Sequence, residues 1–228
     1  MKEKQQGILF IILAGFFFAS MSFFVRLSGD LPTMEKAFFR NAVAVLVAAF
    51  MLARTKEGFH VQKGSWPDLL MRSFFGTVGL ICNFYAVDHM NIADANILNK
   101  LSPFFAILMS YFILKEKANK VEWACVVAAF SCLCTLPFLI AEFRPMKAVQ
   151  LLCLLMAGVS AAGGQIFITK AYTKAPAKEI SVFDYTQVLF AALLGFVFFG
   201  QIPDWMSLVG YLIIIGSAIF KWNYLRKE

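Results

Sequence analysis

The sequence predicts an all-α integral membrane protein, and three of its properties carry that prediction. Of the 228 residues, 60% are hydrophobic and only 15% are charged, whereas a soluble domain is about 45–50% apolar and about 25% charged. Apolar stretches near the length that crosses a bilayer as a helix recur along the chain. Lysine and arginine are concentrated in every second connection between these stretches, which is typical of a multi-pass protein.

Eight membrane helices are expected. The first stretch is 19 residues without a charge, is long for a signal peptide and has no small-x-small cleavage site after it, so we expect an uncleaved helix. The second helix carries Arg40 near its start, the fourth carries Lys100 in its first half, and the fifth ends near Pro137, where a membrane helix tolerates a kink. The expected spans are about residues 7–25, 37–53, 69–87, 95–114, 123–141, 148–169, 180–199 and 206–222.

The placement of lysine and arginine predicts the orientation of these spans. With the N-terminus in the cytoplasm, 14 of the 21 basic residues lie in cytoplasmic segments, four lie within helices, and three lie in outer loops (Lys36, Arg144 and Lys147). This bias predicts cytoplasmic N- and C-termini and an even number of spans. The protein is expected to reside in the inner (plasma) membrane. It also accounts for the net charge of +7, so that no nucleic-acid partner is implied.

An internal repeat is visible when the chain is shifted by 85 residues against itself. The third to fifth expected helices then align without a gap with the sixth to eighth, with matches such as Gly79 with Gly164 and Phe105 with Phe190. The third helix runs outward and the sixth inward, so the two copies have opposite orientations. Inverted repeats are typical of secondary transporters, whose substrate site lies near the midplane where the repeats meet.

Three stretches resemble one family. They are AFFRNAVAVLVAAF, with an arginine opening the second helix, NKLSPFFAILMSYFILKEK, with a proline in the fourth helix and a glutamate at its end, and KAPAKEISVFDYTQVLFAALLGFVFFGQIPDWMSLVGYLIIIGSAI, with an Ala-Pro turn and a Gly-Gln-x-Pro helix end. Together they resemble the drug/metabolite transporter superfamily, and within it the EamA-type permeases. The motifs identify the superfamily and not the substrate.

The resemblance implies a fold from which this chain departs. Such permeases usually have ten helices in two halves of five, with a cavity lined by the third and fourth helix of each half. Here residues 1–141 are expected to form a first repeat of five helices, and residues 148–228 an incomplete second repeat of three. The resemblance implies that the third, fourth, sixth and seventh helices line the cavity. Whether the bundle closes alone or recruits a second copy as a homodimer stays open.

Two charged residues lie inside expected helices of this cavity. Lys100 is about five residues into its helix, roughly 8 Å from the outer end. It is expected to hold an anionic group of the substrate or to pair with a helix carboxylate, and the alternative is that it extends to the outer headgroups. Asp184 is about four residues inside the cytoplasmic end of its helix. It is the candidate for proton coupling or ammonium binding, or it stabilises a helix N-terminus.

Neutral polar residues on the same helices complete the candidate substrate site. Asn96, Asn99 and Lys100 share one helix face through their i, i+3, i+4 spacing, which makes them the strongest group. Hydrogen bonding between helices explains any one of these asparagines, tyrosines and Gln187 equally well. The run from Gly158 to Gly164, which precedes Gln165, is interpreted as a close helix-packing surface, with substrate passage as the alternative. The remaining candidates are Asn83, Tyr85, Gln165, Tyr185 and Gln187.

These observations predict a secondary transporter, an exporter or permease that moves a small polar metabolite such as an amino acid by alternating access. Its partners are the lipid bilayer and that small molecule. No nucleotide-binding Gly-x-x-x-x-Gly-Lys motif occurs, and no cofactor, metal site or catalytic residue is expected. The alternative is a truncated, non-transporting paralogue that serves as a membrane partner or subunit. An enzyme is disfavoured because no expected span contains a histidine, a pair of aspartates or a serine beside a base.

Overall fold

A computed structural model describes residues 2–54, 66–99, 146–176, 180–205, 207–209, 211–212 and 215–216. Every regular element among them is helical, as the sequence predicts. The expected span at 123–141 and most of the one at 95–114 lie outside the described residues. The elements are α1 (Lys2–Leu27), α2 (Thr33–Arg54), α3 (Trp66–His89), α4 (Ile92–Asn99), α7 (Ala148–Lys174), the 3-10 helix η1 (Ser181–Tyr185) and α9 (Thr186–Phe199).

Three of these helices are long and apolar enough to cross a membrane, judged by length and composition. They cover Glu3–Leu27, Ala148–Lys174 and Val182–Phe199. Most helices extend a few residues beyond the expected spans, because the backbone remains helical through the charged residues that flank each apolar body. The helix expected at 180–199 begins as the 3-10 helix η1 and continues directly into α9.

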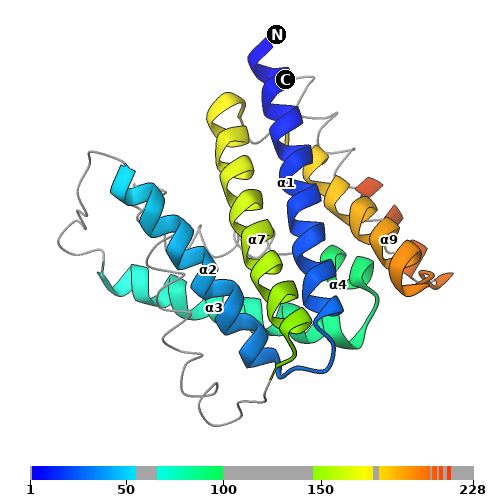
Figure 1. Cartoon of the computed structure of the whole chain (residues 1–228). Helices are drawn as coiled ribbons and strands as arrows, with labels where there is room; N and C mark the ends of the chain where they lie inside the picture. Colours follow the sequence, from blue (N-terminus) through cyan, green and yellow to red (C-terminus); the bar gives the residue numbers. More distant parts are fainter. Residues whose placement is uncertain are drawn as a thin grey trace.

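Helix α1 is the centre of the bundle (Figure 1). It packs along α7, which runs antiparallel to it, and against α9 on another side, while α2 packs on α7. The short α4 lies at the end of α1 and contacts α9, and α3 crosses the bundle near the same end. Alanine is frequent in the buried core, and it lets the helices approach closely. One core cluster combines Met21, Val25, Ala37, Phe84, Val87, Ala95, Ala157 and Ala161 from five helices.

The glycines of α7 lie in close contact with neighbouring helices. A Cβ at Gly158 would lie 2.5 Å from the Cβ of Val43 on α2, and Cβ atoms at Gly163 and Gly164 would each lie 2.9 Å from a ring carbon, of Phe17 and Phe18 respectively. No side chain larger than hydrogen fits there without movement of the partner. The structure confirms this glycine run as a packing surface.

Several connections meet at one end of the bundle, which we call the Ser28 end: residues 27–33, 88–92, 146–150 and 199–204. The turn from α1 to α2 passes through Gly29, whose φ of +73° is in the left-handed region that favours glycine. Gly200 ends α9 in the same region, with φ of 60°. The sequence predicts that this end faces outward, because α1 leads to it from the N-terminus.

Candidate functional site

A buried polar cluster joins α1, α4 and α9. The amide nitrogen of Gln187 on α9 donates a hydrogen bond to Oδ1 of Asn96 on α4, and the hydroxyl of Ser22 on α1 donates to the same oxygen at 3.4 Å. Nδ2 of Asn96 donates to the carbonyl of Ile92, one turn earlier in α4, at 2.8 Å. Ser22, Asn96 and Gln187 are each no more than 2% exposed.

This cluster brings together residues that are far apart in the chain. Asn96 lies in the expected first repeat and Gln187 in the expected second repeat, 91 positions later. Burying a primary amide without a partner costs about 1–3 kcal/mol, so each amide here favours the approach of the other. Two neutral amides and a hydroxyl offer both hydrogen-bond donors and acceptors, which suits a polar solute with the same capacity.

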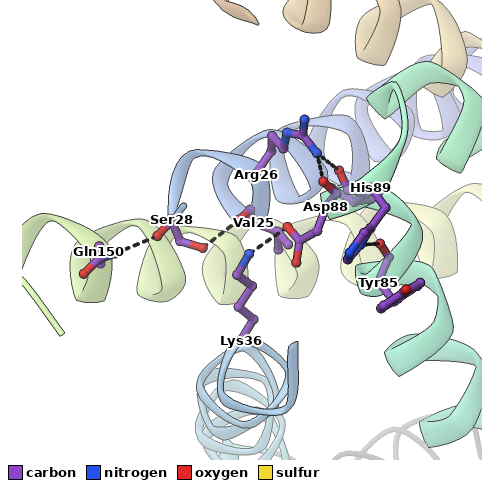
Figure 2. A network of polar contacts seen from close by, with 9 residues as sticks. Val25, Arg26, Ser28, Lys36, Tyr85, Asp88, His89 and Gln150 are labelled. Atoms are coloured by element: carbon purple, nitrogen blue, oxygen red, sulfur yellow. Dashed lines mark hydrogen bonds and ion pairs between the residues drawn. The ribbon is translucent and has the colours of Figure 1, made fainter. Parts of the chain in front are cut away.

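A second polar network lies at the Ser28 end (Figure 2). The ammonium of Lys36 on α2 lies 2.7 Å from a carboxylate oxygen of Asp88 on α3. Arg26 on α1 donates to the carbonyls of Val87 and Asp88 at the end of α3, the first at 2.8 Å. A guanidinium suits this position because the carbonyls at a helix C-terminus carry partial negative charge.

The same network reaches α7. Nε2 of Gln150 donates to the carbonyl of Ser28 at 3.1 Å, and its Oε1 accepts from the backbone N–H of Lys147 at 3.0 Å. The hydroxyl of Ser28 donates to the carbonyl of Val25 at 2.7 Å. Side chains therefore link α1, α2, α3 and α7 at this end, as Figure 2 shows.

The turn after α9 adds further polar contacts. Oε1 of Gln201 accepts a hydrogen bond from the backbone N–H of Ile92 at 3.0 Å, and the hydroxyl of Tyr211 donates to the carboxylate of Asp94 on α4. Asp204 follows in the same turn and accepts from the backbone N–H of Ser207 at 2.8 Å. Hydrogen bonds from Ser207 hold the pKa of the exposed Asp204 carboxyl below its ordinary value.

The structure joins only some of the predicted site residues. Asn96 and Gln187 meet, as described above. Asn83 on α3 and Tyr185, the last residue of η1, are half-buried. Asp184 is half-buried in η1, which packs against α1.

Three other predicted residues are exposed in the described part of the chain: Tyr85, Asn99 and Gln165. Asn99 therefore does not share a buried surface with Asn96 there, although both lie on α4. Lys100, the third member of that group, lies outside the described residues. Tyr85 stacks instead on His89 of the same helix, with ring centroids 4.0 Å apart.

Several polar contacts have no signal in the sequence. Ser22 looks like any serine in an apolar helix, where its hydroxyl usually bonds the carbonyl four residues back, as it does here to Phe18 at 3.3 Å. Lys36 was expected in an outer loop, and this expectation is wrong: Lys36 lies in the first turn of α2 and is 1% exposed. A local pattern does not reveal its partner, because Asp88 is 52 positions away.

Comparison with known proteins adds a family to this geometry. The EamA-like transporter family matches residues 5–136 and, a second time, residues 125–221. A pseudopaline exporter of Pseudomonas aeruginosa is 28% identical, in an alignment that spans 94% of this chain and 95% of the exporter. Human solute carrier family 35 member G1 is 24% identical, in an alignment that spans 97% of this chain and 81% of the human protein. A riboflavin transporter of Vibrio cholerae is 23% identical, in an alignment that spans 98% of this chain and 95% of that transporter. No solved structure gives a significant match.

These alignments are longer than the chain. The alignment with the pseudopaline exporter runs over 272 positions, whereas this chain has 228 residues. The exporter therefore has at least 44 aligned positions that face no residue here.

Proposed function

Because the chain belongs to the EamA-like transporter family, we propose that it is a secondary transporter, an exporter or permease, that moves a small polar metabolite such as an amino acid across the inner membrane by alternating access. A protein of this family lies in the lipid bilayer and acts on small molecules. Relatives named as exporters and transporters support this class over an enzyme. The observation that carries the proposal is the buried contact between Asn96 and Gln187.

The chemistry of this contact supports a polar substrate. Substrate binding at the cluster requires that Asn96 and Gln187 separate, which leaves their amides without the hydrogen bond that they now share. A hydrogen-bonding solute replaces that bond, whereas an apolar molecule leaves two buried amides unpaired at a cost of about 1–3 kcal/mol each. In this proposal the cluster is both the substrate contact and the filter against apolar molecules.

The Ser28 end supports alternating access. Lys36, Asp88, Arg26 and Gln150 connect four helices there, so the structure fits a conformation that is closed at this end. Transport by alternating access requires a second conformation in which these contacts are broken. We propose that the Lys36–Asp88 pair and the Arg26 contacts form the closure on the outer side.

Asp184 remains the proposed coupling carboxylate. It is half-buried in η1, which packs against α1. If proton movement drives transport through Asp184, then Asp184→Asn abolishes the acceleration of transport by a pH gradient while binding is retained. Transport that keeps its pH-gradient dependence in this variant contradicts the assignment.

The proposal is tested by a thermal-shift screen of the purified protein in detergent against a library of amino acids and related metabolites. A compound that raises the melting temperature of the wild type is expected to lose its effect in Asn96→Ala and Gln187→Ala. Gln6→Ala, at an exposed position of α1, is the matched control and keeps the response. Lys100→Ala, in the same screen, tests the predicted anion contact. A folded protein that no compound stabilises argues against a polar-metabolite site.

A second candidate is a non-transporting partner subunit. The aligned positions that the exporter has and this chain lacks are enough for two membrane helices, the number that the sequence predicts to be missing. The purified chain in proteoliposomes distinguishes the two candidates. Substrate flux by this single polypeptide, as a monomer or a homodimer, excludes the partner reading, and flux that appears only with a second, different polypeptide supports it.

A further inference from the structure

The turn that follows α9 fixes the position of one glutamine side chain. The N–H of Gly200 donates to the carbonyl of Phe196 at 3.1 Å, and the N–H of Gln201 donates to the carbonyl of Gly195 at 3.0 Å. The left-handed conformation of Gly200 reverses the chain at this point, as glycine commonly does at a helix end. The backbone of Gln201 is thereby held on the last turn of α9.

The side chain of Gln201 lies back over that helix. A Cβ built on Gly195 would lie 2.9 Å from Oε1 of Gln201, so the glycine leaves room for the carboxamide. From there Oε1 accepts a hydrogen bond from the backbone N–H of Ile92, 109 positions away in the other repeat. Ile92 is the first residue of α4, where the backbone N–H groups have no partner within the helix, and its side chain is 0% exposed.

The helix that Gln201 contacts also carries Asn96. Ile92 donates its N–H to Gln201 and accepts at its carbonyl from Nδ2 of Asn96, one turn later. Asn96 in turn accepts from Gln187 on α9. Helix α4 therefore has two contacts in this region: Asn96 meets α9 through Gln187, and Ile92, at the start of α4, meets the turn after α9 through Gln201.

We infer that Gln201 is a positioning residue that sets the rotation and height of α4 against α9 so that Asn96 meets Gln187. It acts on the site through Ile92 and Asn96 and does not itself touch the substrate. This inference rests on the proposed function for its importance in transport, but the geometry that it predicts is measurable without a substrate. It gives the Gly-Gln-x-Pro segment a specific role.

The test measures the energetic coupling between Asn96 and Gln187. A double-mutant cycle of Asn96→Ala and Gln187→Ala, read by unfolding in mixed micelles, is made in the wild-type, Gln201→Met and Gln201→Glu backgrounds. Methionine keeps the length of the side chain without an amide oxygen, and glutamate keeps an acceptor oxygen. The coupling is expected to be largely lost with methionine and retained with glutamate. If Gln201 only stabilises the fold, its substitution by methionine lowers the free energy of unfolding but leaves the coupling between Asn96 and Gln187 unchanged. That result overturns the inference.

A second variant keeps the test decisive if Gln201→Met does not fold. Gly195→Ala places a methyl group against the Gln201 carboxamide without changing Gln201, and is expected to weaken the coupling in the same way. Unchanged coupling in this variant contradicts the inference.

Uptake of a mixture of labelled L-amino acids into proteoliposomes is measured in parallel. Coupling that depends on Gln201 in a protein without amino-acid uptake supports the positioning role and counts against the proposed substrate class. Amino-acid uptake by a protein whose coupling does not depend on Gln201 supports the proposed substrate class and contradicts the positioning role.

Discussion

Lys36 and Asp88 form an ion pair of 2.7 Å in which the lysine side chain is 1% exposed and the aspartate side chain 16% exposed. A lysine is rarely buried to this degree unless a partner charge compensates for its lost hydration. The pair joins the first turn of α2 to the last turn of α3 and lies beside the Arg26 contacts (Figure 2). The Ser28 end is therefore held together by charge as well as by packing.

Removal of the lysine charge alone is expected to destabilise the protein. Lys36→Met leaves the Asp88 carboxylate without its partner and is expected to lower the free energy of unfolding by about 3 kcal/mol. The measurement is unfolding in mixed micelles. Adding Asp88→Asn to this variant removes the isolated charge and is expected to recover much of the loss.

The exposed pair of Lys174 and Glu3 provides the comparison for this variant. Its atoms are 3.2 Å apart, and its side chains are 40% and 75% exposed. Lys174→Met is therefore expected to change the free energy of unfolding by less than about 1 kcal/mol. Equal effects of the two lysine variants would contradict the view that Lys36 is a buried, partnered charge.

Loss of the arginine contacts is expected to open the Ser28 end. Arg26→Met removes the hydrogen bonds to the carbonyls of Val87 and Asp88. In the proposed alternating-access cycle, this variant is expected to shift the population toward the conformation that is open at this end, by about tenfold for each 1.4 kcal/mol lost. Ser28 is 0% exposed, so Ser28→Cys, in a chain whose five native cysteines are replaced, reports the opening. Labelling by a membrane-impermeant maleimide is expected to be faster with Arg26→Met. An unchanged labelling rate would argue that Arg26 has no part in the closure.

The contact between α2 and α7 is expected to be sensitive to a single methyl group. Gly158→Ala places a Cβ 2.5 Å from Val43 Cβ and 3.1 Å from the carbonyl oxygen of Arg40, which is expected to cost about 1–3 kcal/mol of stability. Gly79→Ala on α3 is the matched control, since its Cβ meets no atom of the described residues within 4 Å. Thermal unfolding in detergent compares the two, and Gly79→Ala is expected to be neutral or stabilising because alanine favours a helix.

The exposed carboxylate of Asp204 is expected to make the stability of the protein depend on pH, because it accepts a hydrogen bond at the start of the helical residues that follow it. Its pKa is lower in the folded than in the unfolded protein, because Ser207 hydrogen-bonds the charged form. Its contribution to stability is therefore present above the ordinary value of 3.8 and is lost as the pH falls through the lower, folded pKa. The difference in melting temperature between the wild type and Asp204→Ala is expected to shrink in that range. Asp204→Asn keeps an acceptor oxygen but has no titrating group, so its difference in melting temperature from Asp204→Ala should not shrink as the pH falls. If that difference shrinks as much as it does for the wild type, the assignment to Asp204 is contradicted.

Much of the fold follows from local sequence patterns. Long apolar runs separated by charged loops predicted the helices that the structure describes, because a membrane helix satisfies its own backbone hydrogen bonds and needs only enough apolar residues to cross the bilayer. The glycine run of α7 was correctly interpreted as a packing surface. The resemblance to the EamA-type permeases is confirmed by a family match over most of the chain. The division at residue 141 and the full number of spans remain predictions.

The same reasoning predicts only some of the residues of the candidate site. A polar residue inside an apolar helix is detectable one residue at a time, so Asn96 and Gln187 were both nominated. Their contact was not, and neither was Ser22, because hydrogen bonds over 74 and 91 positions depend on how helices rotate against each other. Tyr85, Asn99 and Gln165 have equally polar side chains but are exposed in the described part.

By itself, the sequence determined the membrane class, the family and the polar residues among which a site is found. The tertiary structure decided which of those residues meet: Asn96 with Gln187, Lys36 with Asp88, and Gln201 with the first amide of α4. The physical reason is the distance along the chain over which each interaction acts. Hydrophobicity and helix formation are set by neighbours a few residues apart, whereas the partner of a buried polar group is set by the packing of whole helices.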